Sequence, residues 1–202
     1  NVWQKTRANW RYVHENYFEE FDFFIFGGDD YFVIPANLKT YLASDEIRRE
    51  SAERGVYLGR RFKANGNPQR IFNSGGAGYV FDRRALRTLI QQLDRPHCKP
   101  TLRAFYEDVM VAQCLKNAAQ PIHAYDTRDP QGRERFHPFQ PGHHLSYRAN
   151  TRANDWYPKY SIDLKFGPDC CSPDSVSYHY VKPDLALHLH ALLHRCRTVT
   201  SR

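Results

Sequence analysis

The chain has 202 residues, 41% of them hydrophobic and 14% aromatic, which suits one domain with a buried core and argues against a disordered tail. No stretch reaches the roughly 18 consecutive apolar residues that a membrane-spanning helix requires. The formal net charge of +7 favours an anionic partner such as a phosphate group. Basic residues form no long run and the aromatic residues do not alternate with arginines, so we expect no nucleic-acid partner.

Helical and strand patterns alternate in the first half of the chain. Trp3, Trp10, Val13 and Tyr17 recur on one helical face, which predicts a helix over residues 1–20. The elements predicted next are a buried strand at 21–26, a short strand at 31–34, a helix at 35–42, strands at 56–58 and 78–81, and a helix that begins after an Asp82 N-cap.

The second half has fewer regular patterns. A helix is predicted over 106–117, with Glu107 and Asp108 in its first turn, where the helix dipole tolerates negative charge. Residues 127–173 are rich in Pro, Gly and His and are expected to be mostly loop, followed by a strand at 177–181 and a helix at 183–196. Alternating strands and helices predict an α/β domain, and such domains bind ligands at strand ends.

The cysteine spacing does not show whether the protein lies in an oxidising or a reducing compartment. They stand at positions 98, 114, 170, 171 and 196 without a C-x-x-C pair, so neither a zinc ribbon nor a thioredoxin motif is expected. One or two disulfides in a secreted domain and buried thiols in a cytosolic protein fit the spacing equally well. His190 and His194 share a helix face, but no third ligand for zinc is evident.

The segment FDFFIFGGDDYFVIP (21–35) places two adjacent carboxylates between apolar runs. Like charges side by side repel unless a positive group lies near them. In the simplest interpretation this is a solvated turn in which Asp29 or Asp30 caps the next segment. In the alternative interpretation it binds Mg²⁺ or Mn²⁺, with phosphate supplying further oxygen ligands.

A set of motifs in fixed order decides between these interpretations. The motifs are WQKTRANWRYVHENY, the acidic turn, YLGRRFK, NSGGAGYVF, EDVMVAQCL, RERFHPFQPGHHL, GPDCCSPDSVSYHYV and KPDL, and they cover nearly the whole chain. In this order they resemble the inverting β1,3-glycosyltransferases of the Golgi, and most closely the core 1 β1,3-galactosyltransferases, which extend GalNAc on Ser or Thr.

The resemblance implies a GT-A fold, a UDP-sugar donor and Mn²⁺ bound at a D-x-D motif. By this match Asp30 is a direct metal ligand, Asp29 supports it, and His179 is the histidine ligand. Asp108 matches the catalytic base, which inversion requires to take the proton from the acceptor hydroxyl. Glu107 would lie with it at the donor and acceptor. The metal would stabilise charge on the leaving UDP.

Other matched positions are expected around the sugars. Gly75, Gly76 and Ala77 would let the backbone approach the substrate closely. Arg60 and Arg61 would face the diphosphate or acceptor, or else form a surface pair.

An aromatic segment resembles the acceptor-binding region of the family. Trp156 and Tyr157 would stack on the acceptor sugar, with core packing as the alternative.

The resemblance also bears on the whole protein. Cys98, Cys114, Cys170 and Cys171 match family cysteines, which favours the oxidising secretory pathway and a Golgi-lumenal domain of a membrane-anchored protein that could be a homodimer. Only about one helix and one strand precede the acidic turn, so residues 1–202 are expected to be the C-terminal portion of a single, N-terminally truncated GT-A catalytic domain.

The predicted reaction is transfer of galactose from UDP-galactose, in β1,3 linkage, to O-linked GalNAc of glycoproteins. One alternative is a Fringe-like β1,3-GlcNAc transferase, although the segments FHPF and GPDCCS favour the galactosyltransferase. The other alternative is a non-catalytic, chaperone-like relative. Gly28 stands where the family has its first Asp and favours this alternative, whereas Asp30, Asp108 and His179 oppose it.

Overall fold

The computed structural model describes residues 1–150 and 154–195. Its helices are α1 (Val2–Tyr17), α2 (Pro35–Leu42), α3 (Asp45–Glu53), α4 (Arg83–Gln92), α5 (Glu107–Lys116), α6 (Pro141–Ser146), α7 (Trp156–Tyr160) and α8 (Pro183–His194). Short 3-10 turns occur at Ala64–Gly66, Pro96–Cys98 and Gly167–Cys170. Within these described ranges, no helix combines the length and apolar character that crossing a membrane requires.

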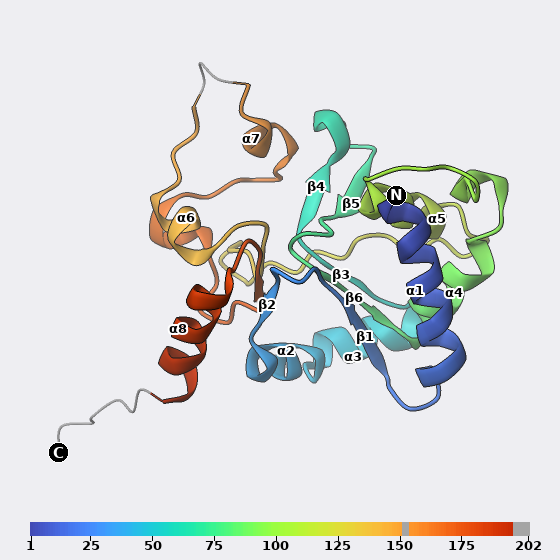
Figure 1. The fold of residues 1–202 in the computed structure, drawn as a ribbon, viewed down its shortest axis with the longest axis horizontal. Coiled ribbons are helices and arrows are strands. Elements are labelled where there is room, and N and C mark those ends of the chain that lie inside the picture. The colour runs from blue at the N-terminus through green and yellow to red at the C-terminus, as the bar shows by residue number, and fades with distance from the viewer. Residues whose placement is uncertain (151–153, 196–202) are drawn as a thin grey trace.

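The strands are short and form small sheets. They are β1 (Phe23–Phe26), β2 (Phe32–Val33), β3 (Tyr57–Gly59), β4 (Arg61–Lys63), β5 (Ile71–Asn73), β6 (Tyr79–Asp82), β7 (Phe136–His137) and β8 (Ser177–Tyr178). The sheet orders are β1-β6-β3, β2-β8-β7 and β4-β5. The β7–β8 pair is parallel, and the other paired strands are antiparallel. Helices with small sheets confirm the predicted α/β class (Figure 1).

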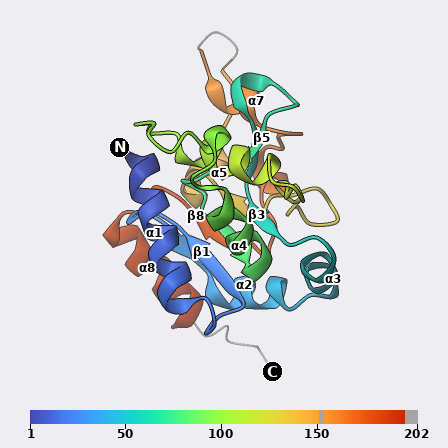
Figure 2. The same ribbon diagram turned by 90° about the vertical axis from the view of Figure 1, so that its right-hand side faces the viewer.

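Both faces of the β1-β6-β3 sheet are covered. Consecutive strand residues point to opposite faces, so Tyr79 and Phe81 of β6 join the core formed with α1, α4 and α5, whereas Val80 joins a second core with α2 and α3. Trp3 and Trp10 of α1 are buried in the first core, as their helical spacing predicts. Figure 2 shows α1, α4 and α5 gathered on the same side of the strands.

Most predicted elements are present within a few residues of their expected ends. The helix at 35–42 has its predicted limits, and Asp82 caps α4 by accepting a hydrogen bond from the N–H of Ala85 at 2.7 Å. The strand predicted over 21–26 is present, but it lies at the edge of its sheet and leaves Ile25 41% exposed. The loop-rich stretch at 127–173 contains β7 and two short helices.

The cysteines form two disulfides in the structure. Cys98 is joined to Cys114 of α5, and Cys170 is joined to its neighbour Cys171. The interpretation with disulfides is therefore the one that the structure supports. Cys196, the last residue of the helix predicted over 183–196, lies outside the described residues.

Candidate active site

Strand register brings the acidic turn to the glycine-rich loop. In the antiparallel β1–β6 pair, Phe26 at the end of β1 faces Tyr79 at the start of β6. The residues after Phe26 therefore lie beside those that precede Tyr79. These are the acidic turn, with Asp29 and Asp30, and the loop at 74–78.

A second pairing brings His179 to the same turn. Phe32 of β2 faces Tyr178 of β8, so the residue after Tyr178 lies near the residues before Phe32. The backbone N–H of Val181 donates to the carbonyl oxygen of Asp30 at 2.9 Å and holds the two segments together. Nε2 of His179 consequently lies 3.2 Å from Oδ1 of Asp30.

The Asp30–His179 pair is partly open to solvent. The side chain of Asp30 is 38% exposed and that of His179 is 18% exposed. Nδ1 of His179 lies 3.3 Å from the carbonyl oxygen of Pro138, and this contact restrains the ring. Asp29 is exposed beside them. A carboxylate oxygen and an imidazole nitrogen thus face one space, as ligands of one cation do.

Asp108 enters the same space from the first turn of α5. Its Oδ2 accepts the backbone N–H of Gly75 at 3.0 Å, and its Oδ1 accepts the N–H of Val109 at 2.8 Å. Burial raises the pKa of Asp108, while these two hydrogen bonds oppose the rise because they stabilise the carboxylate. The side chain is therefore held in a fixed orientation and is a stronger base than an exposed aspartate.

Glu107, beside it, is more deeply buried. It is 5% exposed, and its Oε2 accepts a hydrogen bond from the hydroxyl of Tyr79 at 3.0 Å. Burial, and secondarily the charge of Asp108, raise the pKa of Glu107 to about 8. A carboxyl group with this pKa is mostly protonated at neutral pH, so the adjacent pair carries close to one negative charge.

The glycine-rich loop makes room for the functional side chains. A Cβ at Gly75 would lie 2.1 Å from Oε1 of Glu107, and one at Gly76 would lie 2.4 Å from Nδ1 of His179. Ala77 is fully buried and its methyl group packs in the second core, so it does not face the site as the resemblance had suggested. The immediate reason for the glycines is thus space for Glu107 and His179.

Most of these groups line one cleft of about 590 Å³, whereas Asp30 is not among its lining residues and adjoins it through its contact with His179. Of the predicted residues, its walls contain Asp29, Gly75, Gly76, Glu107, Asp108 and His179. Its remaining lining residues are Val2, Lys5, Thr6, Asn9, Phe26, Gly27, Gly28 and Phe105.

The contribution of α1 to the cleft is the part that sequence reasoning missed. Lys5, Thr6 and Asn9 share a helical face, and this spacing is the signal that could have revealed them. The hydroxyl of Thr6 is buried without a hydrogen-bond partner among the described residues.

The arginine pair departs from both sequence interpretations. Arg60 is 1% exposed, and its guanidinium group forms a 2.6 Å ion pair with Glu134. It therefore neither lies on the surface nor lines the cleft. Arg61 is half-buried and forms an ion pair with Asp126, also away from the cleft walls. Carboxylate partners, which the sequence pattern could not reveal, account for both side chains.

The two aromatic candidates, Trp156 and Tyr157, differ in how far they are buried. Tyr157 is 3% exposed and packs with Phe62 and Phe72 in a third cluster, as the core alternative anticipated. Trp156 is 45% exposed at the edge of this cluster, with its ring 5.7 Å from that of Phe62. Of the two, Trp156 keeps a face that a sugar could reach.

A larger hollow of about 760 Å³ lies elsewhere, between α2, α3 and α4. Its lining is basic, with Lys39, Arg48, Arg83, Arg84 and Arg87, and it contains none of the predicted site residues. Arg83 and Arg84 already donate hydrogen bonds to backbone carbonyl groups. The smaller cleft is the better candidate because the carboxylates and His179 converge there.

Known proteins give the following similarities. No family model matches the chain. It is 34% identical over 196 residues to glycoprotein-N-acetylgalactosamine 3-beta-galactosyltransferase 1 of Xenopus laevis, covering 96% of this chain and 51% of the relative. It is 27% identical over 117 residues to chondroitin sulfate synthase 3 of Mus musculus and of Homo sapiens, covering 52% of this chain and 12% of each relative.

Fold and homology together define the class of protein as a glycosyltransferase of the GT-A type. More narrowly, the chain is similar over nearly its whole length to the Xenopus core 1 galactosyltransferase, which agrees with the resemblance drawn from the motifs. The chain spans about half the length of that relative.

Proposed function

We propose that the protein transfers galactose from UDP-galactose, with inversion, to O-linked GalNAc of glycoproteins in a β1,3 linkage. The observation that carries the proposal is one cleft that contains Asp108 together with Asp29 and His179, the latter paired with Asp30. The name of the Xenopus relative states a matching acceptor and sugar. Lys5, exposed at the same cleft, supplies a positive charge suited to a diphosphate.

The donor atoms at the acidic turn fit Mn²⁺. An oxygen of Asp30 and a nitrogen of His179 lie 3.2 Å apart and partly exposed, and Asp29 adds a neighbouring carboxylate. Oxygen and imidazole ligands suit this ion, and phosphate oxygens could complete its coordination. When bound, the ion would act as a Lewis acid that stabilises negative charge on the departing UDP.

Asp108 is the general base in this proposal. Hydrogen bonds from two backbone N–H groups fix its carboxylate, and burial makes it more basic. It would accept the proton of the GalNAc hydroxyl as that oxygen attacks the anomeric carbon from the face opposite UDP. Glu107 lines the same cleft and is mostly protonated at neutral pH, so it adds no second negative charge beside Asp108.

We further propose the cellular setting. Two disulfides fit an oxidising compartment. We infer a Golgi-lumenal domain of a membrane-anchored protein, with homodimerisation as a feature of the whole protein.

A non-catalytic, chaperone-like role is the second candidate, and Gly28 is the residue that favours it. A carboxylate at this position is missing from the acidic turn. A Cβ at Gly28 would lie 3.0 Å from Oδ1 of Asp30, so glycine leaves that carboxylate unhindered. One missing carboxylate need not remove the metal site if Asp30 and His179 remain.

Release of UDP by the full-length protein tests the proposal, with UDP-galactose, Mn²⁺ and GalNAc-α-benzyl as acceptor. Asp108→Asn removes the base and keeps the shape, so turnover should fall about 10²- to 10⁴-fold. The matched control is Asp45→Asn, an exposed aspartate in the first turn of α3, which should leave the rate unchanged.

Other outcomes would redirect the assignment. Full activity of Asp108→Asn contradicts the mechanism. Turnover of UDP-GlcNAc on an O-fucosyl acceptor, with none of UDP-galactose on GalNAc, would indicate the Fringe-like alternative. No turnover, with stable association to another transferase, would indicate the chaperone-like role.

A further inference from the structure

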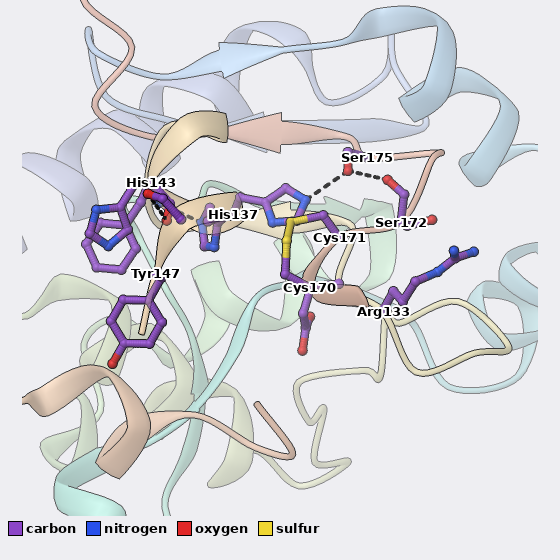
Figure 3. Close-up of a disulfide and its surroundings, with 12 residues drawn as sticks. Arg133, His137, His143, Tyr147, Cys170, Cys171, Ser172 and Ser175 are labelled. Carbon is purple, nitrogen blue, oxygen red and sulfur yellow. Dashed lines mark hydrogen bonds between the residues drawn. A yellow bond between two sulfur atoms is a disulfide. The ribbon is translucent and has the colours of Figure 1, made fainter. Parts of the chain in front are cut away.

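A second group of metal-ligating side chains lies outside the cleft and takes no part in the proposed reaction. One ring nitrogen of His137, one of His144 and Sγ of Cys171 all lie within 4.8 Å of one another. They come from β7, from α6 and from the residue after the 3-10 turn at Gly167–Cys170. Figure 3 shows the ring of His137 between Ser175 and the Cys170–Cys171 disulfide.

Hydrogen bonds fix the tautomer of His137. The hydroxyl of Ser175 donates its proton to the carbonyl oxygen of Ser172 at 2.5 Å. The hydroxyl oxygen of Ser175 must therefore accept a hydrogen bond from Nε2 of His137, at 2.9 Å. This places the ring proton on Nε2. Nδ1 is left with a lone pair.

This lone pair has no protein partner. His137 is 1% exposed, and its Nδ1 is buried without a hydrogen-bond partner among the described residues. Burial holds the pKa of His137 well below its usual value, so the ring is neutral. An unpaired polar atom in the interior is costly and calls for an explanation. A neutral imidazole, oriented by a hydrogen bond on its other nitrogen, is how proteins present histidine to a metal.

His144 is similarly prepared. It is 4% exposed, and burial lowers its pKa to about 3, so this ring is also neutral. Its Nε2 accepts the backbone N–H of Phe139 at 3.2 Å, a long hydrogen bond. A metal could take over this lone pair at the cost of one weak hydrogen bond.

Cys171 cannot be a metal ligand while it is bonded to Cys170. A dithiol reductant would supply two electrons to the S–S bond, which breaks as the reductant closes to its own disulfide, and its two protons pass to the cysteine sulfurs. Cys171 is half-buried and therefore accessible to such a reagent, unlike the fully buried Cys98–Cys114 pair. On metal binding, the thiol of Cys171 would release its proton to solvent and ligate as a thiolate.

We propose that reduction of the Cys170–Cys171 disulfide opens a site for Zn²⁺ or a similar transition-metal ion, formed by His137, His144 and Cys171. Zinc binds imidazole nitrogen at about 2.0–2.1 Å and thiolate sulfur at about 2.3 Å, so the three ligands need to close by roughly 1 Å. Water or the thiol of Cys170 would take the fourth position. The inference is independent of the proposed transferase activity.

Two single substitutions separate this site from nonspecific thiol binding. Cys170→Ser and Cys171→Ser each abolish the disulfide, but only the first leaves a thiol at position 171. With Co²⁺ as the probe and no reductant, Cys170→Ser should show a thiolate-to-cobalt charge-transfer band and bind at least about 10-fold more tightly than Cys171→Ser. Adding His137→Gln to Cys170→Ser should abolish the band.

The wild-type protein provides the redox comparison. It should show no band when oxidised, and should gain one after treatment with a dithiol and anaerobic desalting. Cobalt bound in the cleft would give no such band, because none of the described cysteines is among its lining residues. Equal binding by the two serine variants, or equal spectra of oxidised and reduced wild type, would overturn the proposal. If circular dichroism shows that Cys170→Ser does not fold, the wild type can be used instead. The reduced wild type should then show the cobalt band, and the reduced and alkylated wild type should not.

Discussion

Glu107 is a buried carboxyl group whose pKa is raised to about 8 from an ordinary value of 4.5, chiefly by burial. Between these two pH values the folded chain keeps a proton that the unfolded chain releases. The stability contributed by this group is thus complete below pH of about 4.5 and is lost as pH rises through about 8. Glu107→Gln keeps an acceptor for the Tyr79 hydroxyl and removes the titration.

We therefore expect the free energy of unfolding of the wild type, relative to Glu107→Gln, to fall by a few kcal/mol between about pH 5 and about pH 8.5. Urea denaturation of both proteins at the two pH values measures this difference. Glu53→Gln, at an exposed carboxylate of α3, is the control and should run parallel to the wild type. If the unfolding free energies of the wild type and Glu107→Gln changed equally with pH, the prediction would be contradicted, because Glu107 would then be ionised in the folded protein.

At the scale of the helix, Asp82 organises the start of α4. It is 3% exposed, accepts the N–H of Ala85 at 2.7 Å and accepts the hydroxyl of Ser51 at 2.6 Å. Asp82→Ala removes both acceptors and should destabilise the protein by about 1–3 kcal/mol. Asp82→Asn should recover part of this loss. Chemical denaturation measures both, and a loss below about 0.5 kcal/mol for Asp82→Ala would contradict the capping role.

The helices and strands that could be predicted from sequence are those whose signals lie within a few adjacent residues. The α4 cap and the Pro35 start of α2 depend on a few adjacent residues, and both were predicted from sequence. The α3 helix was missed, although Ser44 caps it and Asp45 and Glu46 occupy its first turn.

The β4–β5 hairpin was also missed, because strands of three residues are too short for a periodic signal. That β1 is an edge strand depends on sheet order, which local pattern does not encode.

At the scale of the molecule, the candidate site is assembled by strand register. The sequence motifs identified Asp30, Asp108 and His179 as a set, yet these residues lie far apart in the chain. Their approach depends on the pairing of β1 with β6 and of β2 with β8. The sequence pattern places Lys5, Thr6 and Asn9 on one helical face, but it does not show that this face lines the cleft. Nor does it show that Glu134 pairs with Arg60, because both are tertiary contacts.

The most direct test of this account is an anomalous difference map from a crystal of the full-length protein soaked with Mn²⁺ and UDP. We expect one strong manganese peak within bonding distance of Oδ1 of Asp30 and Nε2 of His179, with the carboxylate of Asp108 across the same cleft. A manganese ion bound to UDP at any other part of the protein would contradict the account.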